Sequence, residues 1–215
     1  YNRDYYESCD WIGTISKQTY GITKRVWGWD KEKHWTPPAD WQVSYVPHGI
    51  NSELYKQVEV PKDFKQSILG DKEYEFILYW NNRNIRRKQP VDVVLAFNKF
   101  VEALPEDKRD SVCLLMHTEP VQEHGTDLPT TIEHCCLPET NVVFANNRYT
   151  EEQLNWLYNM ADVTINIASN EGFGLATAES VMAGTPIIVT VTGGLQDQCG
   201  FRDKGTGKLL TAEDY

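Results

Sequence analysis

The 215-residue chain carries 21 basic and 31 acidic residues, so its formal net charge at pH 7 is −10. This acidic balance argues against nucleic acid or an anionic membrane surface as the main partner. The hydrophobic content of 40% is enough for a buried core, but no apolar run approaches the ~18 residues of a membrane span. We therefore predict no integral membrane segment and a cytoplasmic protein, peripheral to a membrane at most.

The five cysteines favour neither a disulfide framework nor a zinc ribbon. Their number is odd and none form a Cys-x-x-Cys pair. The five histidines also lack the spacing of metal ligands. The sequence therefore predicts reduced thiols and no metal site.

Residues 1–41 have the character of the end of a domain. A strand is expected at residues 11–16 and a helix from about Lys17. Residues 27–41 then contain four of the seven tryptophans, Trp27, Trp29, Trp35 and Trp41. Tryptophans in such a loop either stack on sugars and anchor partners when exposed, or pin the loop to its own domain when buried. Both interpretations remain open at this point.

The next segment, residues 42–60, has the character of a hinge. A strand at 43–46 leads into Pro47-His48-Gly49, where proline fixes φ and glycine allows a positive φ. His48 is interpreted as structural. A short helix should follow Pro61 and end near Gly70.

A basic loop follows the strand expected at residues 75–80. It runs from Asn81 to Lys88, and Pro90 begins a helix. Ligands of doubly wound sheets bind at the carboxyl ends of the strands, so Arg83 and Lys88 are candidates for binding phosphate. Arg86 and Arg87 are interpreted as solvated or paired with carboxylates.

The middle of the chain alternates between strands and helices. Strands are expected at 112–117 and 141–145, and helices at 132–137 and 150–160, the last with a capping segment at Thr150-Glu151-Glu152-Gln153. His117 ends the first of these strands. It could line a cleft, but we interpret it as a capping or solvated histidine.

The remaining pattern is strand, glycine-bearing loop, helix and strand. Residues 162–167 are rich in β-branched residues, the loop spans 170–174, and Gly184 stops the helix before a strand at 187–190. Backbone N–H groups at the helix N-terminus could hold a phosphate.

Two glutamates flank this glycine loop and the helix after it. Glu171 precedes the helix and Glu179 lies eight residues later, which corresponds to about 12 Å of rise and an offset of about 80°. Ionised carboxylates accept hydrogen bonds and suit sugar and ribose hydroxyls. The alternative is a helix N-terminal charge at Glu171 and a solvated surface residue at Glu179.

The sequence contains a glutamate, seven further residues and a second glutamate, in the context Glu-Gly-Phe-Gly-Leu followed by Ala-Gly-Thr-Pro. This motif resembles that of the retaining GT-B glycosyltransferases of family four, and the resemblance covers roughly residues 42–200. In that family the first glutamate contacts the transferred sugar and the second contacts the ribose hydroxyls. The resemblance implies these roles for Glu171 and Glu179. It also places at the donor the loop residues between them, Gly172, Phe173, Gly174 and Leu175.

The same resemblance extends to the basic loop. The family has Gly-Arg, four residues and Lys there, and its arginine and lysine bind the donor diphosphate. Arg83 and Lys88 keep that spacing, whereas Asn82 replaces the glycine. The family loop corresponding to Asn147 passes the nucleotide base. Gly193 and Gly194 either let the backbone approach a ligand or only form a turn.

The predicted fold class is α/β, of GT-B type: a doubly wound parallel-sheet Rossmann-like domain, with about six strands over residues 42–215, plus the remnant of a second Rossmann-like domain. Residues 1–41 would end an incomplete acceptor-side domain, 42–60 would form the interdomain strand and hinge, and 61–215 would be the C-terminally incomplete nucleotide-sugar-binding domain. Because complete GT-B enzymes have two such domains, a fragment is expected.

The predicted function is retaining transfer of a sugar from a UDP- or GDP-sugar to an acceptor, which could be a saccharide, a lipid-linked sugar or a protein glycan. Arg83, Lys88 and the helix N-terminus would neutralise the leaving diphosphate, so no metal and no cofactor besides the donor are expected. A sugar-nucleotide epimerase of related fold and a catalytically silent sugar-nucleotide-binding module remain alternatives.

Overall fold

The computed structural model describes residues 3–28 and 38–208, and the chain divides into two compact units. The first, the small unit, comprises residues 1–49, 170–175 and 191–215. The second, the sheet unit, comprises residues 50–169 and 176–190. The domain boundaries expected from the sequence stay a prediction.

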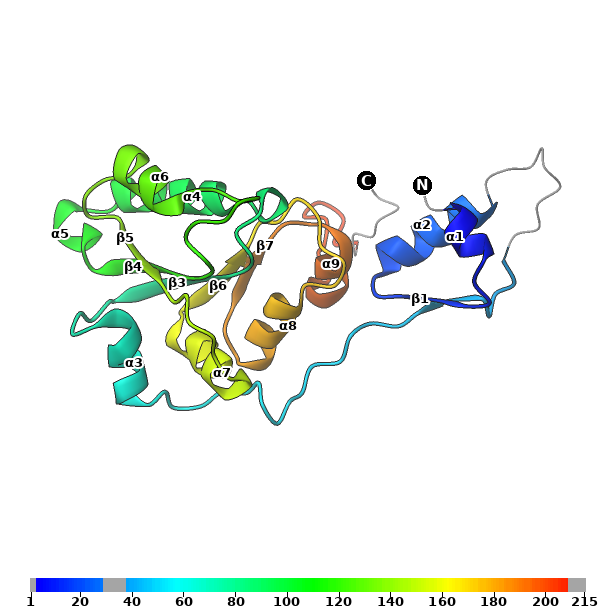
Figure 1. Cartoon of the computed structure of the whole chain (residues 1–215), viewed down its shortest axis with the longest axis horizontal. Coiled ribbons are helices and arrows are strands. Elements are labelled where there is room, and N and C mark those ends of the chain that lie inside the picture. Colours follow the sequence, from blue (N-terminus) through cyan, green and yellow to red (C-terminus); the bar gives the residue numbers. More distant parts are fainter. Residues whose placement is uncertain (1–2, 29–37, 209–215) are drawn as a thin grey trace. The chain divides into compact units, whose positions relative to one another are not determined.

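The sheet unit is built on five parallel strands in the order β5-β4-β3-β6-β7 (Figure 1). Their bounds are β3 (Phe76–Asn81), β4 (Val112–His117), β5 (Asn141–Phe144), β6 (Val163–Asn166) and β7 (Ile187–Val189). The central strand β3 pairs with β4 on one side and β6 on the other, with Tyr79 opposite both Leu115 and Thr164. The strand order therefore reverses between β3 and β6, which is the switch point where doubly wound sheets bind ligands.

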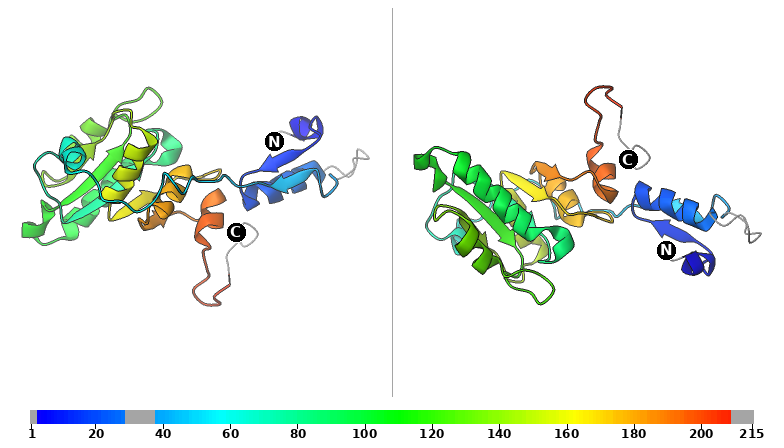
Figure 2. Two further views of the ribbon diagram at one scale, coloured as in Figure 1. Left: turned by 90° about the horizontal axis from the view of Figure 1, so that it is seen from below. Right: turned by 90° about the horizontal axis from the view of Figure 1, so that it is seen from above.

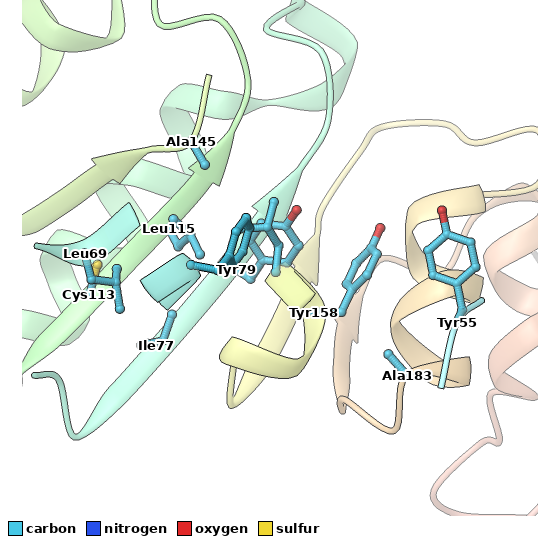
Figure 3. Close-up of a cluster of buried hydrophobic side chains, with 11 residues drawn as sticks. Tyr55, Leu69, Ile77, Tyr79, Cys113, Leu115, Ala145, Tyr158 and Ala183 are labelled. Atoms are coloured by element: carbon cyan, nitrogen blue, oxygen red, sulfur yellow. The ribbon is translucent and has the colours of Figure 1, made fainter. Parts of the chain in front are cut away.

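Both faces of the central strands β3 and β4 are buried, which explains why these two strands are almost continuously apolar. Alternate residues of β3 enter opposite cores: Ile77 and Tyr79 one, Leu78 and Trp80 the other. Figure 1 shows α4 (Pro90–Ala103) and α6 (Leu128–Cys135) on one side of the sheet, and α3 (Lys62–Leu69) and α7 (Glu151–Met160) on the other. Figure 3 shows the core on the α7 side.

Local signals explain where these helices begin. Thr150 and Gln153 form the expected capping box before α7, with Thr150 N donating to Gln153 Oε1 over 2.9 Å. Helix α6 begins at Leu128, earlier than the expected 132, because the Asp127 carboxylate caps Thr130 N at 3.0 Å. The sheet unit also contains the short α5 (Glu106–Arg109), the 3₁₀ turn η2 (Arg86–Lys88) and most of α8 (Leu175–Met182).

The small unit contains α1 (Arg3–Glu7), β1 (Ile12–Thr14), α2 (Lys17–Gly28), β2 (Val43–Tyr45) and α9 (Gly193–Cys199). The strands β1 and β2 pair in parallel and pack against α2, and they are drawn in blue and cyan in Figure 2. The sequence predicted a sheet of about six strands over residues 42–215, but the large sheet has five among the described residues. The strand at Val43–Tyr45 pairs instead with β1, with Val43 opposite Ile12.

The tryptophan-rich segment is described only at its two ends. Trp27 is buried on α2, whereas Trp41 is 66% exposed. Trp29 and Trp35 lie outside the described residues. None of the described helices combines the length and apolar character needed to cross a membrane.

Candidate functional site

Four side chains of the sheet unit form a continuous hydrogen-bonded chain that begins where β3 and β4 end. His117 Nδ1 lies 2.9 Å from Asn81 Oδ1, and Asn81 Nδ2 donates to the Tyr158 hydroxyl at 2.8 Å. The Tyr158 hydroxyl donates in turn to Glu179 Oε2 at 2.7 Å. We call these four residues the edge network. It links the carboxyl edge of the sheet to α7 and α8.

Aromatic packing fixes the centre of the edge network. Tyr158 is completely buried, and its ring makes edge-to-face contacts with Tyr79, 5.2 Å between centroids, and with Tyr55, 6.2 Å between centroids. Figure 3 shows the three rings in a row. The Tyr158 hydroxyl is therefore held in place by ring contacts on both sides.

Burial and hydrogen bonding act in opposite directions on the Glu179 carboxyl. Burial raises its pKa, hydrogen bonds from Tyr158 and Tyr55 oppose this effect, and the nearby charge of Glu151 adds to it. Glu179 is half-buried and bonded to the Tyr158 hydroxyl, so its alternative interpretation as a solvated surface residue is wrong. Burial also raises the pKa of Tyr55 to about 12, so this phenol keeps its proton at neutral pH.

His117 is neither a simple cap nor a solvated histidine. Burial lowers the pKa of its imidazole, and a backbone hydrogen bond with Asn147 opposes that effect. Tyr149 packs edge-on against its ring, 5.3 Å between centroids. The loop after β5, which contains the exposed Asn147, is thus fastened to His117.

The basic loop after β3 is anchored by a residue that the sequence analysis missed. Asn84 is completely buried, and its amide donates to the carbonyls of Glu119, Pro120 and Thr126 at 2.6–3.2 Å. Its side-chain oxygen accepts from Thr126 N at 3.0 Å. Arg83, the residue before this anchor, is exposed.

The end of the basic loop reaches the chain that follows β6. Ser169 N donates to the carbonyl of Arg87 at 2.9 Å. The segments after β3 and β6 therefore meet at the switch point of the sheet. Arg83 and Lys88 both lie in the loop after β3, at the carboxyl end of that strand as expected. Their contact with phosphate stays a prediction.

In the small unit, the predicted residue Glu171 is buried in a loop that α9 holds in place. Gly194 N donates to the carbonyls of Glu171, at 3.2 Å, and Gly172, at 3.1 Å. A Cβ on Gly193, whose φ is +48°, would lie 1.6 Å from the Glu171 carbonyl oxygen. The glycine pair thus allows the α9 backbone to lie directly against the backbone of the Glu171 loop. Instead of forming only a turn, the two glycines begin α9. Direct contact of these glycines with a donor stays a prediction.

The rest of this loop is held by side chains of the small unit. Gln198 Nε2 donates to the carbonyls of Phe173, at 2.6 Å, and Gly174, at 3.1 Å. The Phe173 ring packs edge-on against His48, with 5.2 Å between centroids. This contact agrees with the structural interpretation of His48. Leu175 is 48% exposed.

The predicted residues fall into two groups. Arg83, Lys88, Asn147 and Glu179 belong to the sheet unit, whereas Glu171, Gly172, Phe173, Gly174, Leu175, Gly193 and Gly194 belong to the small unit. Their roles toward a ligand stay predictions. Asn81, Tyr158 and Asn84 were not identified from the sequence.

Residues 61–214 match the sequence profile of the family described as glycosyl transferases group 1. The chain belongs to this family. A segment of 57 residues is 42% identical to a D-inositol 3-phosphate glycosyltransferase of Thermomonospora curvata, and it covers 26% of this chain and 13% of that relative. The match is too short to assign the activity of that relative to this chain.

Solved structures show the same fold. The HepE protein of Anabaena, in complex with UDP and glucose, matches with a TM-score of 0.67 and 16% identity over 92% of this chain and 48% of its own. Sucrose-phosphate synthase of Thermosynechococcus elongatus matches with a TM-score of 0.66 and 22% identity over 91% of this chain and 44% of its own. The chain thus spans about half the length of these structures. The predicted α/β fold class of GT-B type is confirmed.

Proposed function

We propose that this chain contributes nucleotide-sugar binding to a retaining glycosyltransferase, which transfers a sugar from a UDP- or GDP-sugar without a metal. The observation that carries the proposal is the Glu179 carboxylate, held by phenols in a network that begins at the carboxyl edge of β3. The HepE protein, which shares the fold, was solved in complex with UDP and glucose and also with UDP-glucose. These complexes support a nucleotide sugar as the ligand.

Glu179 is proposed to accept hydrogen bonds from the ribose hydroxyls. A carboxylate has about four lone-pair positions, and the two phenols bonded to Glu179 leave some of them available. Partial burial strengthens each remaining hydrogen bond because little water competes for it.

The proposed role of Glu179 is tested by calorimetry with UDP, GDP and their sugars. Glu179→Ala should weaken binding of the preferred nucleotide by ~1.5–3 kcal/mol, the range for hydrogen bonds to a charged group. Glu152→Ala, which removes an exposed carboxylate from α7, is the matched control and should bind like the wild type. Equal affinities for Glu179→Ala and the control would refute the ribose role.

Arg83 and Lys88 are proposed to neutralise the diphosphate, both in the bound donor and as the leaving group departs. Arg83→Ala and Lys88→Ala should each weaken UDP or GDP binding by ~1.5–3 kcal/mol while leaving uridine or guanosine binding almost unchanged. Arg86→Ala removes another exposed cation of the same loop and serves as the control. If nucleoside binding falls as much as diphosphate binding, these side chains do not contact phosphate.

A product assay with the protein separates the alternatives. A transferase forms a new glycoside whose anomeric configuration matches the donor, an epimerase returns an altered sugar nucleotide, and a silent module forms no product. The assay is repeated in EDTA. A requirement for added magnesium or manganese would contradict the metal-free part of the proposal.

A further inference from the structure

Each hydrogen bond of the edge network is donated toward Glu179, from His117 to Asn81, from Asn81 to Tyr158 and from Tyr158 to Glu179. The Asn81 amide nitrogen donates to Tyr158, so its oxygen faces His117 and accepts the Nδ1 proton. The Tyr158 oxygen already accepts from Asn81, so its own proton is directed to Glu179. That order matches an ionised Glu179, because a carboxylate can only accept.

A neighbouring tyrosine shows that burial alone does not require this arrangement. Tyr79 is as deeply buried as Tyr158 and touches its ring, yet its hydroxyl has no hydrogen-bond partner among the described residues. Tyr158 differs because its hydroxyl both accepts from Asn81 and donates to Glu179. The two tyrosines therefore form a matched pair, one with a role in the network and one without.

We propose that Tyr158 is a positioning residue: it receives its orientation from Asn81 and His117, and it holds Glu179 as an ionised acceptor for ribose hydroxyls. This inference rests on the proposed ribose role of Glu179. It adds that selectivity for ribose over deoxyribose depends on a hydroxyl that does not itself touch the nucleotide. Without that hydroxyl, the carboxylate would lose both a fixed orientation and a donor that favours its charged form.

The inference also predicts the direction of a pH effect. Four titratable groups from neighbouring elements interact with the Glu179 charge. They are Tyr158 and Glu151 of α7, Tyr55 of the segment before α3, and Tyr79 of β3. The Tyr158 hydrogen bond lowers the pKa of Glu179 against the raising effect of burial. Ribose binding should be present above this pKa and lost as the pH falls through it. Removing the Tyr158 hydroxyl should move that loss to higher pH.

The experiment compares Tyr158→Phe with the control Tyr79→Phe. Calorimetry gives the affinities of the wild type and both variants for UDP or GDP and for the 2′-deoxy and 3′-deoxy analogues, between pH 5 and 8. Wild type and Tyr79→Phe should prefer the ribonucleotide by about tenfold or more, the fold equivalent of one hydrogen bond to a charged group. Tyr158→Phe should lose most of this preference and show its low-pH loss of binding at a higher pH.

The outcomes separate the two proposals. If the wild type itself does not prefer the ribonucleotide, the ribose role of Glu179 fails. If the wild type does and Tyr158→Phe keeps the same preference and pH profile, the positioning role is overturned. Should Tyr158→Phe fail to fold, Asn81→Ala takes its place, because it removes the bond that orients the Tyr158 hydroxyl. Unchanged selectivity in that variant would equally overturn the inference.

Discussion

Replacing Glu171 with glutamine is expected to reduce sugar transfer by about 10²–10³-fold, the cost of removing one preorganised group that acts on the reacting part of a substrate. Glu171 is only 8% exposed, and its carbonyl accepts a backbone hydrogen bond from Gly194. Its proposed partner is the transferred sugar, so affinity for the free nucleotide should change little. Glutamine keeps the shape of the side chain and removes only the charge, which limits effects on folding.

The matched comparison for Glu171→Gln is Glu179→Gln. The first variant should lower kcat with little change in nucleotide affinity, and the second should lower nucleotide affinity. Initial rates of sugar transfer and calorimetry with free UDP or GDP give both quantities. Equal losses of free-nucleotide affinity in the two variants would show that the sugar and ribose roles are assigned wrongly.

Local sequence patterns identified most elements of the sheet unit. The apolar run at 112–117 is β4, and the pair Thr150 and Gln153 caps α7 as expected. These features depend on residues close together in the chain, where periodicity and capping chemistry are visible. The family resemblance likewise rests on short motifs within continuous segments.

The edge network could not be predicted because its members are distant in sequence. Asn81 is separated from His117 by 36 positions and from Tyr158 by 77. Each residue alone has an ordinary local explanation, such as a strand end or a helix face. Only the parallel pairing of β3 with β4, which sets Asn81 opposite His117, brings the first pair together.

Helix α9 was not predicted, for a different reason. Its first two residues are Gly193 and Gly194, which have poor helix propensity and are typical of turns. Their presence follows from a long-range requirement, because the 171–173 backbone lies against them. In the sequence alone, a glycine pair that allows two backbone segments to pack closely looks the same as a glycine pair in a turn.

Replacing Gly193 with alanine is expected to destabilise the protein by about 2–5 kcal/mol, because two costs combine. Its φ of +48° is unfavourable for a residue with a Cβ, and that Cβ would lie 1.6 Å from the Glu171 carbonyl oxygen. The clash is with backbone, which cannot rotate away as a flexible side chain can. Relief requires α9 or the Glu171 loop to move.

Two control variants in the same unit separate these costs. Gly207 has a φ of +69°, and a Cβ added to it would meet nothing within 4 Å, so Gly207→Ala isolates the backbone cost at about 1–2 kcal/mol. Gly194 has no positive φ, but its Cβ would lie 2.5 Å from Phe173 Cα, so Gly194→Ala isolates overpacking at about 1–3 kcal/mol. Urea unfolding of the three variants measures each free energy. Because Gly193→Ala carries both costs, it should be the least stable, and a loss no larger than that of Gly207→Ala would contradict the close approach of α9 to the Glu171 loop.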